Sequence, residues 1–324
     1  MNLKTLSSLE LQRKATLEIQ SNPNLFIRKI LDAELKPYQN TICKTIIGNK
    51  RTAIAACHAL GKSWTMARIV LQFGACFPNS KIITTAPSYN QVKNILWSEI
   101  RTAYQKSKFP LGGVMLQTEW KINTDHFALG FTPRNENVIG EGQGTASSFQ
   151  GFHAEHILVI FDEATGIPHN IWNMAEGLLT SANVRFVAIG NPTSRQSQFY
   201  KCFSFLQWAK IYLSCFDSIN LKANNLLNIK DLEREIDFVR TLSNEDKQKR
   251  FKEYKVVKPY MLATDWVVGS ALKWGLTHPL FVSKVLGKFP EDGENSLITL
   301  GMLEDAKFRI YYPKESDRKS IGVD

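Results

Sequence analysis

Short apolar runs constrain the fold of this 324-residue chain more than any other feature of its sequence. In most of them, Ile, Val, Ala and Phe follow one another and do not alternate with polar residues. Such runs are typical of parallel strands that helices cover on both faces. Strands are predicted at 52–57, 81–87, 156–162 and 184–192, with a further plausible strand at 209–215.

Helical patterns lie between these runs. One helix is predicted at 64–73, and Ser88 with Gln91 forms a capping box for another. The second helix has apolar residues at helical spacing, namely Val92, Ile95, Leu96 and Ile100. Alternating strands and helices predict an α/β fold with a mainly parallel central sheet flanked by helices.

The character of the sequence changes after about residue 216, where it becomes helical and highly charged. A basic run lies within 12 positions and contains Lys247, Lys249, Arg250, Lys252, Lys255 and Lys258. This run is either a solvated helix face or a contact for DNA or phosphate. The predicted segments are an N-terminal helical segment at 1–35, a core at 36–216, a helical lid or linker subdomain at 217–275 and a linker at 276–324.

Charge and cysteine content narrow the function classes. The chain has 40 Lys and Arg residues against 30 Asp and Glu residues, a net charge of +10. This balance favours an anionic partner such as nucleic acid or phosphate, although a merely basic soluble protein would also show it. Five scattered cysteines without a CxxC pair fit a reduced cytosolic protein. No apolar stretch approaches the roughly 18 residues of a membrane span, and the N-terminus is not a signal peptide.

The stretch "ACHALGKSW" at 56–64 predicts a phosphate-binding loop, because it follows a strand and opens a helix. Ala56 stands where the first glycine of such a loop is expected. Lys62 would reach the β and γ phosphates of ATP, and the Ser63 hydroxyl would ligate Mg²⁺. The nucleotide contacts predicted on this stretch are Ala59, Leu60, Gly61, Lys62, Ser63 and Trp64.

Three further strand-associated motifs complete the predicted site. Asp162 ends the strand at 156–162 and would hold Mg²⁺, and Glu163 would orient and deprotonate the attacking water; alternatively, the pair is a helix N-cap. Gly190-Asn191-Pro192-Thr193 would sense the γ-phosphate, or is an ordinary turn. Gln39, with Tyr38, would form a paired hydrogen bond to an adenine edge, or is the N-terminal Gln of a helix.

In this order, the motifs resemble the large terminase subunit of tailed bacteriophages over roughly residues 30–324. The motifs are "PYQNTI", "HALGKSW", "IITTAPSYNQV", "SSFQGFHAEHILVIFDEA" and "AIGNPTS"; superfamily-2 helicases share most of them. The resemblance implies a P-loop NTPase of the ASCE type that uses ATP and Mg²⁺. It also implies double-stranded DNA, a portal protein and a small terminase subunit as partners, a homo-oligomeric ring on the portal, and the cytoplasm of an infected or lysogenic bacterial host.

The resemblance also assigns individual residues. His58 occupies the place where many relatives carry a catalytic Arg; alternatively, it packs the loop. Gln150-Gly151 stands where relatives often have Arg-Gly, which leaves the arginine from a neighbouring subunit unassigned, with Arg134 as one candidate. Asn191 falls at the coupling motif. Asp324, in the terminal "GVD", resembles the first metal ligand of an RNase H-like nuclease, so the linker at 276–324 would lead into the first strand of a truncated nuclease domain; alternatively, the sequence ends in Asp by chance. The other ligands are absent on either interpretation, so we do not expect nuclease activity.

Two other functions fit part of the sequence. A superfamily-2 helicase-type remodeller would need a second motor lobe, for which the residues after 216 are too few. A scaffold that binds nucleotide without hydrolysing it is supported mainly by Ala56. The motif set therefore favours an ATPase that translocates viral DNA into a procapsid.

Overall fold

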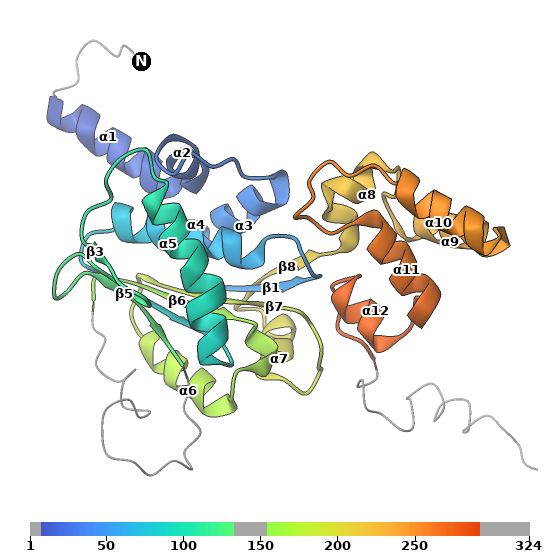
Figure 1. Cartoon of the computed structure of the whole chain (residues 1–324). Helices are drawn as coiled ribbons and strands as arrows, with labels where there is room; N and C mark the ends of the chain where they lie inside the picture. Colours follow the sequence, from blue (N-terminus) through green and yellow to red (C-terminus); the bar gives the residue numbers. More distant parts are fainter. Residues whose placement is uncertain (1–7, 133–153, 292–324) are drawn as a thin grey trace, which may run out of the picture.

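The computed structural model describes residues 8–132 and 154–291 (Figure 1). In the described residues, one eight-stranded sheet has the order β3-β4-β5-β2-β6-β7-β1-β8. The strands are β1 (Arg51–Ala56), β2 (Ser80–Thr85), β3 (Val114–Met115), β4 (Glu119–Lys121), β5 (Phe127–Phe131), β6 (His156–Asp162), β7 (Val184–Gly190) and β8 (Ala209–Leu213). All five predicted strands are therefore present.

Six of these strands, from β5 through β8 in the sheet order, pair in parallel. β3 and β4 add an antiparallel edge beside β5. β7 separates β1, which leads into the phosphate loop, from β6, which ends at Asp162. This additional strand between the two motif-bearing strands is the ASCE arrangement, and it confirms the predicted fold class.

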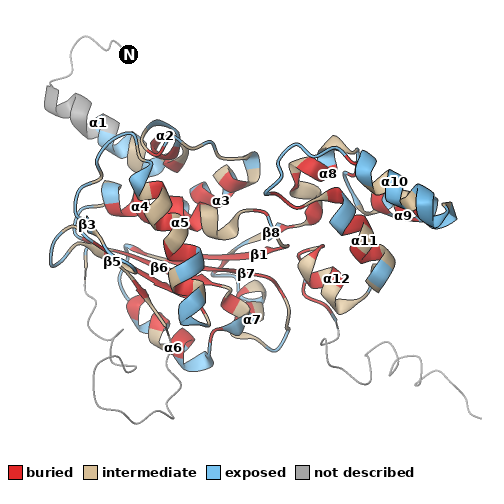
Figure 2. Ribbon diagram, viewed as in Figure 1, coloured by how far each residue is buried: buried red, intermediate tan, exposed pale blue. Residues whose placement is uncertain are grey.

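Helices cover both faces of the sheet (Figures 1 and 2). α1 (Ser8–Ser21), α2 (Pro23–Lys29), α3 (Pro37–Gly48), α4 (Lys62–Cys76) and α5 (Trp97–Gln105) lie on one side, and α6 (His169–Leu178) and α7 (Gln198–Ser204) on the other. Two clusters of buried hydrophobic residues lie on the two faces of the sheet. The side chains of β1 alternate between them, with Ile54 in one cluster and Ala53 in the other. Burial on both faces explains why the strands read as continuous apolar runs.

A π-helix at Gln91–Leu96 directly precedes α5, so the helical segment after β2 begins at Gln91. The predicted capping box is present: Ser88 N donates to Gln91 Oε1 at 3.1 Å, and Gln91 N donates to Ser88 Oγ at 3.3 Å. Of the apolar residues expected on one face, Val92, Leu96 and Ile100 are buried but Ile95 is 50% exposed. A π turn contains more residues than an α turn, so it rotates Ile95 away from the core.

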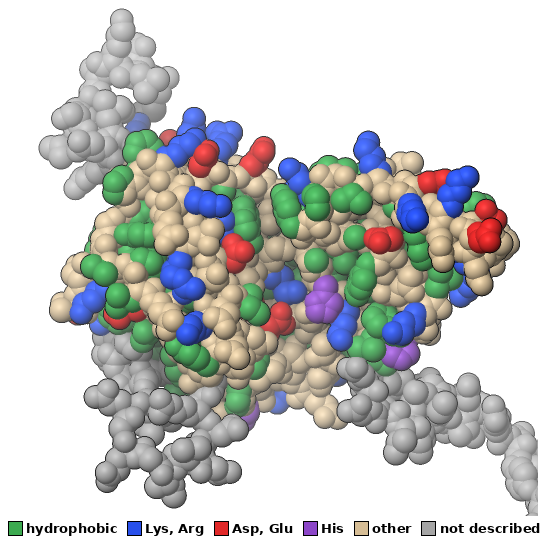
Figure 3. All heavy atoms as spheres, in the orientation of Figure 1, with side chains coloured by type: hydrophobic (Ala, Val, Ile, Leu, Met, Phe, Trp, Pro, Cys, Tyr) green, Lys and Arg blue, Asp and Glu red, His purple; other side chains and the backbone are tan. Residues whose placement is uncertain are grey.

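A second group of helices follows the sheet: α8 (Ile219–Ala223), α9 (Ile229–Thr241), α10 (Asn244–Glu253), α11 (Thr264–Trp274) and α12 (Pro279–Lys284). We call these residues, 219–284, the helical lobe (right-hand side of Figures 1 and 3). The lobe continues past the predicted boundary at residue 275. Its buried residues Leu262 and Phe281 share one hydrophobic cluster with Leu60 of the loop after β1, so the lobe packs directly on the part of the chain that carries the sheet.

Among the described residues, no helix is long and apolar enough to cross a membrane. Arg134, Gln150-Gly151 and Asp324 lie outside the described residues, and their assignments stay predictions.

Candidate active site

The phosphate loop joins β1 to α4 and turns sharply at two residues. Ala59 has φ 52° and Gly61 has φ 73°, both in the left-handed region. Ala56, by contrast, ends β1, is fully buried and has no positive φ. A Cβ is accommodated there, so the loop does not require the missing first glycine. The first N–H groups of a helix such as α4 lack intrahelical partners, which makes them available to phosphate.

Neighbouring elements hold the loop from two sides. Tyr38, on α3, donates its hydroxyl to Leu60 O at 2.9 Å. From the helical lobe, Leu262 N donates to Ala59 O at 3.1 Å, and Lys284 O accepts from His58 N at 2.9 Å. Burial raises the pKa of Tyr38 well above its ordinary value, so the hydroxyl remains a donor. Tyr38, which the sequence assigned to the nucleotide, thus contacts the loop backbone.

Lys62 lies at the carboxyl ends of β1 and β7. Its Nζ donates to Cys57 O at 3.1 Å and to Asn191 Oδ1 at 3.5 Å. Asn191 is buried and donates its Nδ2 to Ala56 O at 2.7 Å. Asn191 therefore connects the end of β1 with the side chain of Lys62. A shift of β1 or β7 would move the hydrogen-bond partners of the Lys62 ammonium group.

Ser63 and Asp162 meet across the site, as the sequence predicted for a shared metal. Ser63 Oγ donates to Asp162 Oδ2 at 2.9 Å. Burial, and then the charge of Glu163, raises the pKa of the Asp162 carboxyl from 3.8 to about 6. A bound cation would relieve both effects. Among the described residues, no three His, Cys, Asp or Glu side chains converge on one site. One buried carboxylate with a hydroxyl fits Mg²⁺, which commonly takes its other ligands from phosphates and water.

Replacing Asp162 by asparagine is expected to change how stability depends on pH. The folded-state pKa of Asp162 lies above its ordinary value, so wild-type protein gains stability relative to Asp162→Asn as the pH falls from 7 to 4. The difference in unfolding free energy should change by up to about 3 kcal/mol across this range. Urea unfolding of both proteins in EDTA measures it; parallel pH profiles would contradict the raised pKa.

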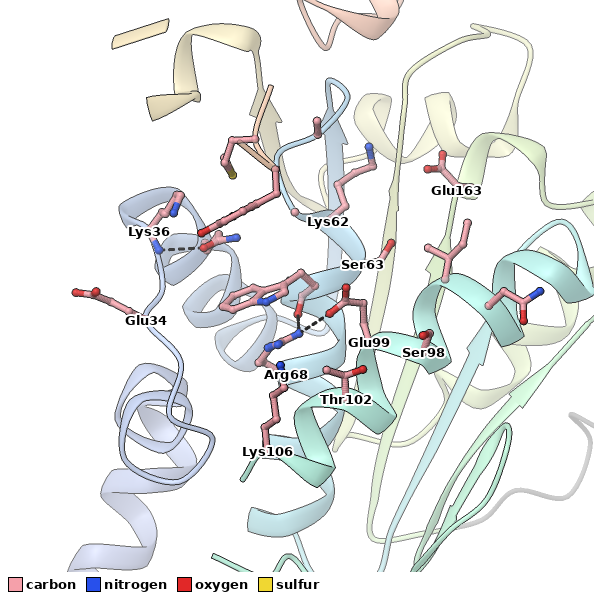
Figure 4. A pocket seen from close by; sticks show the side chains of 18 residues that line it. Glu34, Lys36, Lys62, Ser63, Arg68, Ser98, Glu99, Thr102, Lys106 and Glu163 are labelled. Atoms are coloured by element: carbon pink, nitrogen blue, oxygen red, sulfur yellow. Dashed lines mark hydrogen bonds and ion pairs between the residues drawn. The ribbon is translucent and has the colours of Figure 1, made fainter. Parts of the chain in front are cut away.

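Glu163 follows β6 with φ 49°, an uncommon conformation for a non-glycine residue. Its side chain lines the same pocket as Lys62 and Ser63 (Figure 4). Among the described residues, this carboxylate has no hydrogen-bond or ion-pair partner, so it is available to a water molecule. Thr165 Oγ1 donates to Asn191 O at 2.6 Å and ties the segment after Glu163 to the end of β7.

Because Gly190 has no side chain, the ends of β6 and β7 can lie close together. A Cβ at position 190 would lie 2.9 Å from Ala164 N and 3.2 Å from Glu163 Cα. We expect Gly190→Ala to cost about 1–3 kcal/mol of stability, because only backbone atoms can yield, and to displace Glu163. Gly177→Ala is the matched control, since a Cβ there meets nothing within 4 Å. Urea unfolding compares the two variants, and equal stability would contradict the close approach.

His58 does not provide a fixed positive charge. Burial, then the charge of Lys62, lowers its pKa from 6.5, so the imidazole is neutral at pH 7. Its ring contacts Trp266 of the helical lobe edge-on, with centroids 6.4 Å apart. These observations favour the loop-packing alternative; the catalytic assignment of His58 stays a prediction.

Gln39 partly has the role that the alternative interpretation predicted, that of the N-terminal Gln of a helix. It is buried at the N-terminus of α3, where its Oε1 accepts from Lys36 N at 3.0 Å in a capping box. An amide oxygen can accept a second hydrogen bond, so the paired hydrogen bond to an adenine edge is compatible with the capping bond and stays a prediction. The Nε2 group remains, close to Gly61 and without a partner among the described residues.

The pocket around these residues has a volume of about 730 Å³ and extends beyond the phosphate loop (Figure 4). Sequence reasoning missed several lining residues, because they carry no motif and come from helix faces, from the segment before α3 or from the distant lobe. They are Glu34, Lys36, Arg68, Asn94, Ile95, Ser98, Glu99, Thr102, Lys106, Tyr260 and Met261. The one local signal is the spacing of Arg68, one helical turn after Trp64.

Comparison with curated proteins supports the resemblance indicated by the motifs. No family model matches the chain. The "Probable terminase, large subunit" of Enterobacteria phage P7 is 28% identical over 162 residues, which cover 46% of this chain. The match spans 30% of the length of that relative. The predicted similarity to large terminase subunits is thus confirmed.

Solved structures give weaker likenesses. The large terminase ATPase domain of Thermus phage P74-26 is 15% identical at a TM-score of 0.46, covering 69% of this chain and 95% of that one. The large terminase of another thermophilic bacteriophage, in complex with ATP-gamma-S, is 11% identical at a TM-score of 0.43, covering 86% and 52%. At these TM-scores the likenesses add no argument for the fold, which rests on the strand order.

Proposed function

We propose that this chain is the ATPase part of a phage large terminase subunit, hydrolysing ATP to drive double-stranded viral DNA into a procapsid. The observation that carries the proposal is the convergence of Lys62, Ser63, Asp162, Glu163 and Asn191 at the carboxyl ends of adjacent strands. This is where open α/β sheets bind ligands. The similarity to the phage P7 protein supports the choice of family.

In the proposed mechanism, backbone N–H groups at 59–64 and the Lys62 ammonium bind the triphosphate. Ser63 and Asp162 would hold Mg²⁺, which neutralises phosphate charge when bound. Glu163 orients the attacking water and takes its proton, a role for which its unpaired carboxylate is suited. Asn191, bonded to both Lys62 and Ala56, would transmit loss of the γ-phosphate to β1 and β7.

Duplex DNA is the proposed polymer, bound through its phosphates without sequence choice. The helical lobe offers exposed lysines for this contact: Lys249, Lys252, Lys255 and Lys258. Among the described residues, none of the four forms an ion pair. Arg250 of the same run is committed elsewhere, because Nε and Nη2 donate to Glu235 at 2.9 and 3.0 Å. The lysines are therefore the better candidates for phosphate.

The partners implied by the family complete the proposal: a portal protein, a small terminase subunit and a homo-oligomeric ring in the cytoplasm of a bacterial host. The rival scaffold function loses its main support, since Ala56 fits the end of β1 without strain.

The test is phosphate release from ATP by the whole chain as duplex DNA is added. We expect duplex DNA to accelerate turnover, and the acceleration to fade as salt rises, because counterion release drives phosphate contacts. Turnover that ignores duplex DNA at low salt would contradict the translocation proposal while leaving the ATPase assignment intact.

A further inference from the structure

The pocket extends beyond the phosphate loop, and its lining there includes two aromatic residues from separate elements. Trp64 comes from the first turn of α4, directly after Ser63. Tyr260 comes from the segment between α10 and α11 of the helical lobe. Both line the pocket, together with Gln39 and Met261. A ligand whose phosphates lie on residues 61–63 would bring its remaining part to this end.

Trp64 is held in a fixed orientation. The Cζ atom of Arg68 lies 3.9 Å from the centroid of the Trp64 ring. The same guanidinium donates to Trp64 O at 3.1 Å and to Glu99 Oε2 at 3.0 Å, and Arg68 is only 7% exposed. One face of the indole is thus covered by a cation that cannot swing away, so a ligand can stack only on the opposite face. Arg68 acts as a positioning residue for this ring.

Tyr260 is exposed, yet its backbone is held firmly. The side chain is 72% exposed and therefore free to contact a ligand. Buried Asn220 accepts from Val257 N and Lys258 N at 2.8 and 2.9 Å, and donates to Met261 O and Leu262 O at 3.3 and 3.2 Å. Leu262 N in turn bonds to Ala59 O of the phosphate loop. The ring is therefore presented to the pocket by a preformed support.

We propose that Trp64 and Tyr260 are the stacking surfaces for the base of the bound nucleotide. The inference rests on the proposed ATPase function and deepens it. The Nε2 donor of Gln39 has no partner among the described residues and can donate to the N7 atom of a purine base. The slot therefore binds the purine base of the nucleotide mainly through stacking.

The experiment is equilibrium dialysis of the whole chain with Mg²⁺ and radiolabelled ATP, competed by unlabelled ATP or inorganic tripolyphosphate. We expect ATP to bind at least about tenfold more tightly than tripolyphosphate, because stacking contributes to ATP alone. Tyr260→Ala and Trp64→Ala should each weaken ATP binding about tenfold and leave tripolyphosphate binding unchanged.

Two further variants separate stacking from general damage. Tyr260→Phe keeps the ring and should retain ATP affinity. Phe238→Ala removes another exposed aromatic side chain of the lobe, which is 50% exposed and does not line the pocket, and should have no effect. Tyr260 is exposed, so its loss should not unfold the chain even if Trp64→Ala does.

The failures of the two proposals can be told apart. Unchanged ATP binding in Tyr260→Ala, or equal binding of ATP and tripolyphosphate by the wild type, would overturn the base slot and leave the ATPase proposal standing. Binding of neither ATP nor tripolyphosphate would overturn the proposed function and the slot together.

Discussion

Glu163→Gln should reduce ATP hydrolysis roughly 10²–10⁴-fold while leaving ATP binding nearly unchanged. The amide keeps the size and polarity of the side chain but cannot accept the proton of the attacking water. Glu163 is tied to no other described side chain, so the change should not disturb Lys62, Ser63 or Asp162. Single-turnover hydrolysis and equilibrium ATP binding, measured on the same preparation, separate the chemical step from affinity.

Glu245→Gln is the matched control, because Glu245 is exposed on α10 and outside the pocket. It should hydrolyse ATP at the wild-type rate. If Glu163→Gln did so as well, Glu163 would not be the residue that activates water.

Lys62→Ala should abolish measurable hydrolysis and weaken ATP binding at least about tenfold. The ammonium group is the one charge that the loop itself directs at the phosphates, and removing such an electrostatic contact commonly costs roughly 10²–10³-fold in rate. In this structure the same ammonium is held by Cys57 O and Asn191 Oδ1, so it is already oriented before a ligand arrives.

Lys44→Ala provides the comparison, since Lys44 is exposed on α3 and does not line the pocket. It lowers the net charge of the chain by the same amount and should leave hydrolysis and affinity unchanged. Equal losses in both variants would mean that overall charge, and not the position of Lys62, controls nucleotide binding.

Much of the sheet could be predicted from sequence because its strands are covered on both faces. β1, β6 and β7 lie inside the sheet and consist almost wholly of buried residues, which gives continuous apolar runs. Residues that follow the carboxyl ends of such strands can be predicted to lie close together from the strand pattern alone. Ser63 Oγ and Asp162 Oδ2 do so at 2.9 Å. The short strands β3 and β4 lie at the edge and give no comparable signal.

The remainder of the site depends on tertiary packing that local patterns do not encode. Tyr260 reaches the pocket only because Leu262 bonds to the phosphate loop from the distant helical lobe. Ile95 looks like a core residue at helical spacing, but a π turn rotates it to the pocket. Gln39 fits either of its two interpretations by pattern, and only the structure shows its capping bond to Lys36. In each case the deciding contact is one that the spacing of residues along the sequence does not reveal.

Single-turnover conversion of bound ATP to ADP, with Mg²⁺ and then with EDTA, tests the central claim most directly. The arrangement of Lys62, Ser63, Asp162 and Glu163 predicts slow but complete conversion that requires Mg²⁺. ATP that binds in the presence of Mg²⁺ and stays intact over many hours would contradict the account and identify the chain as a nucleotide-binding scaffold.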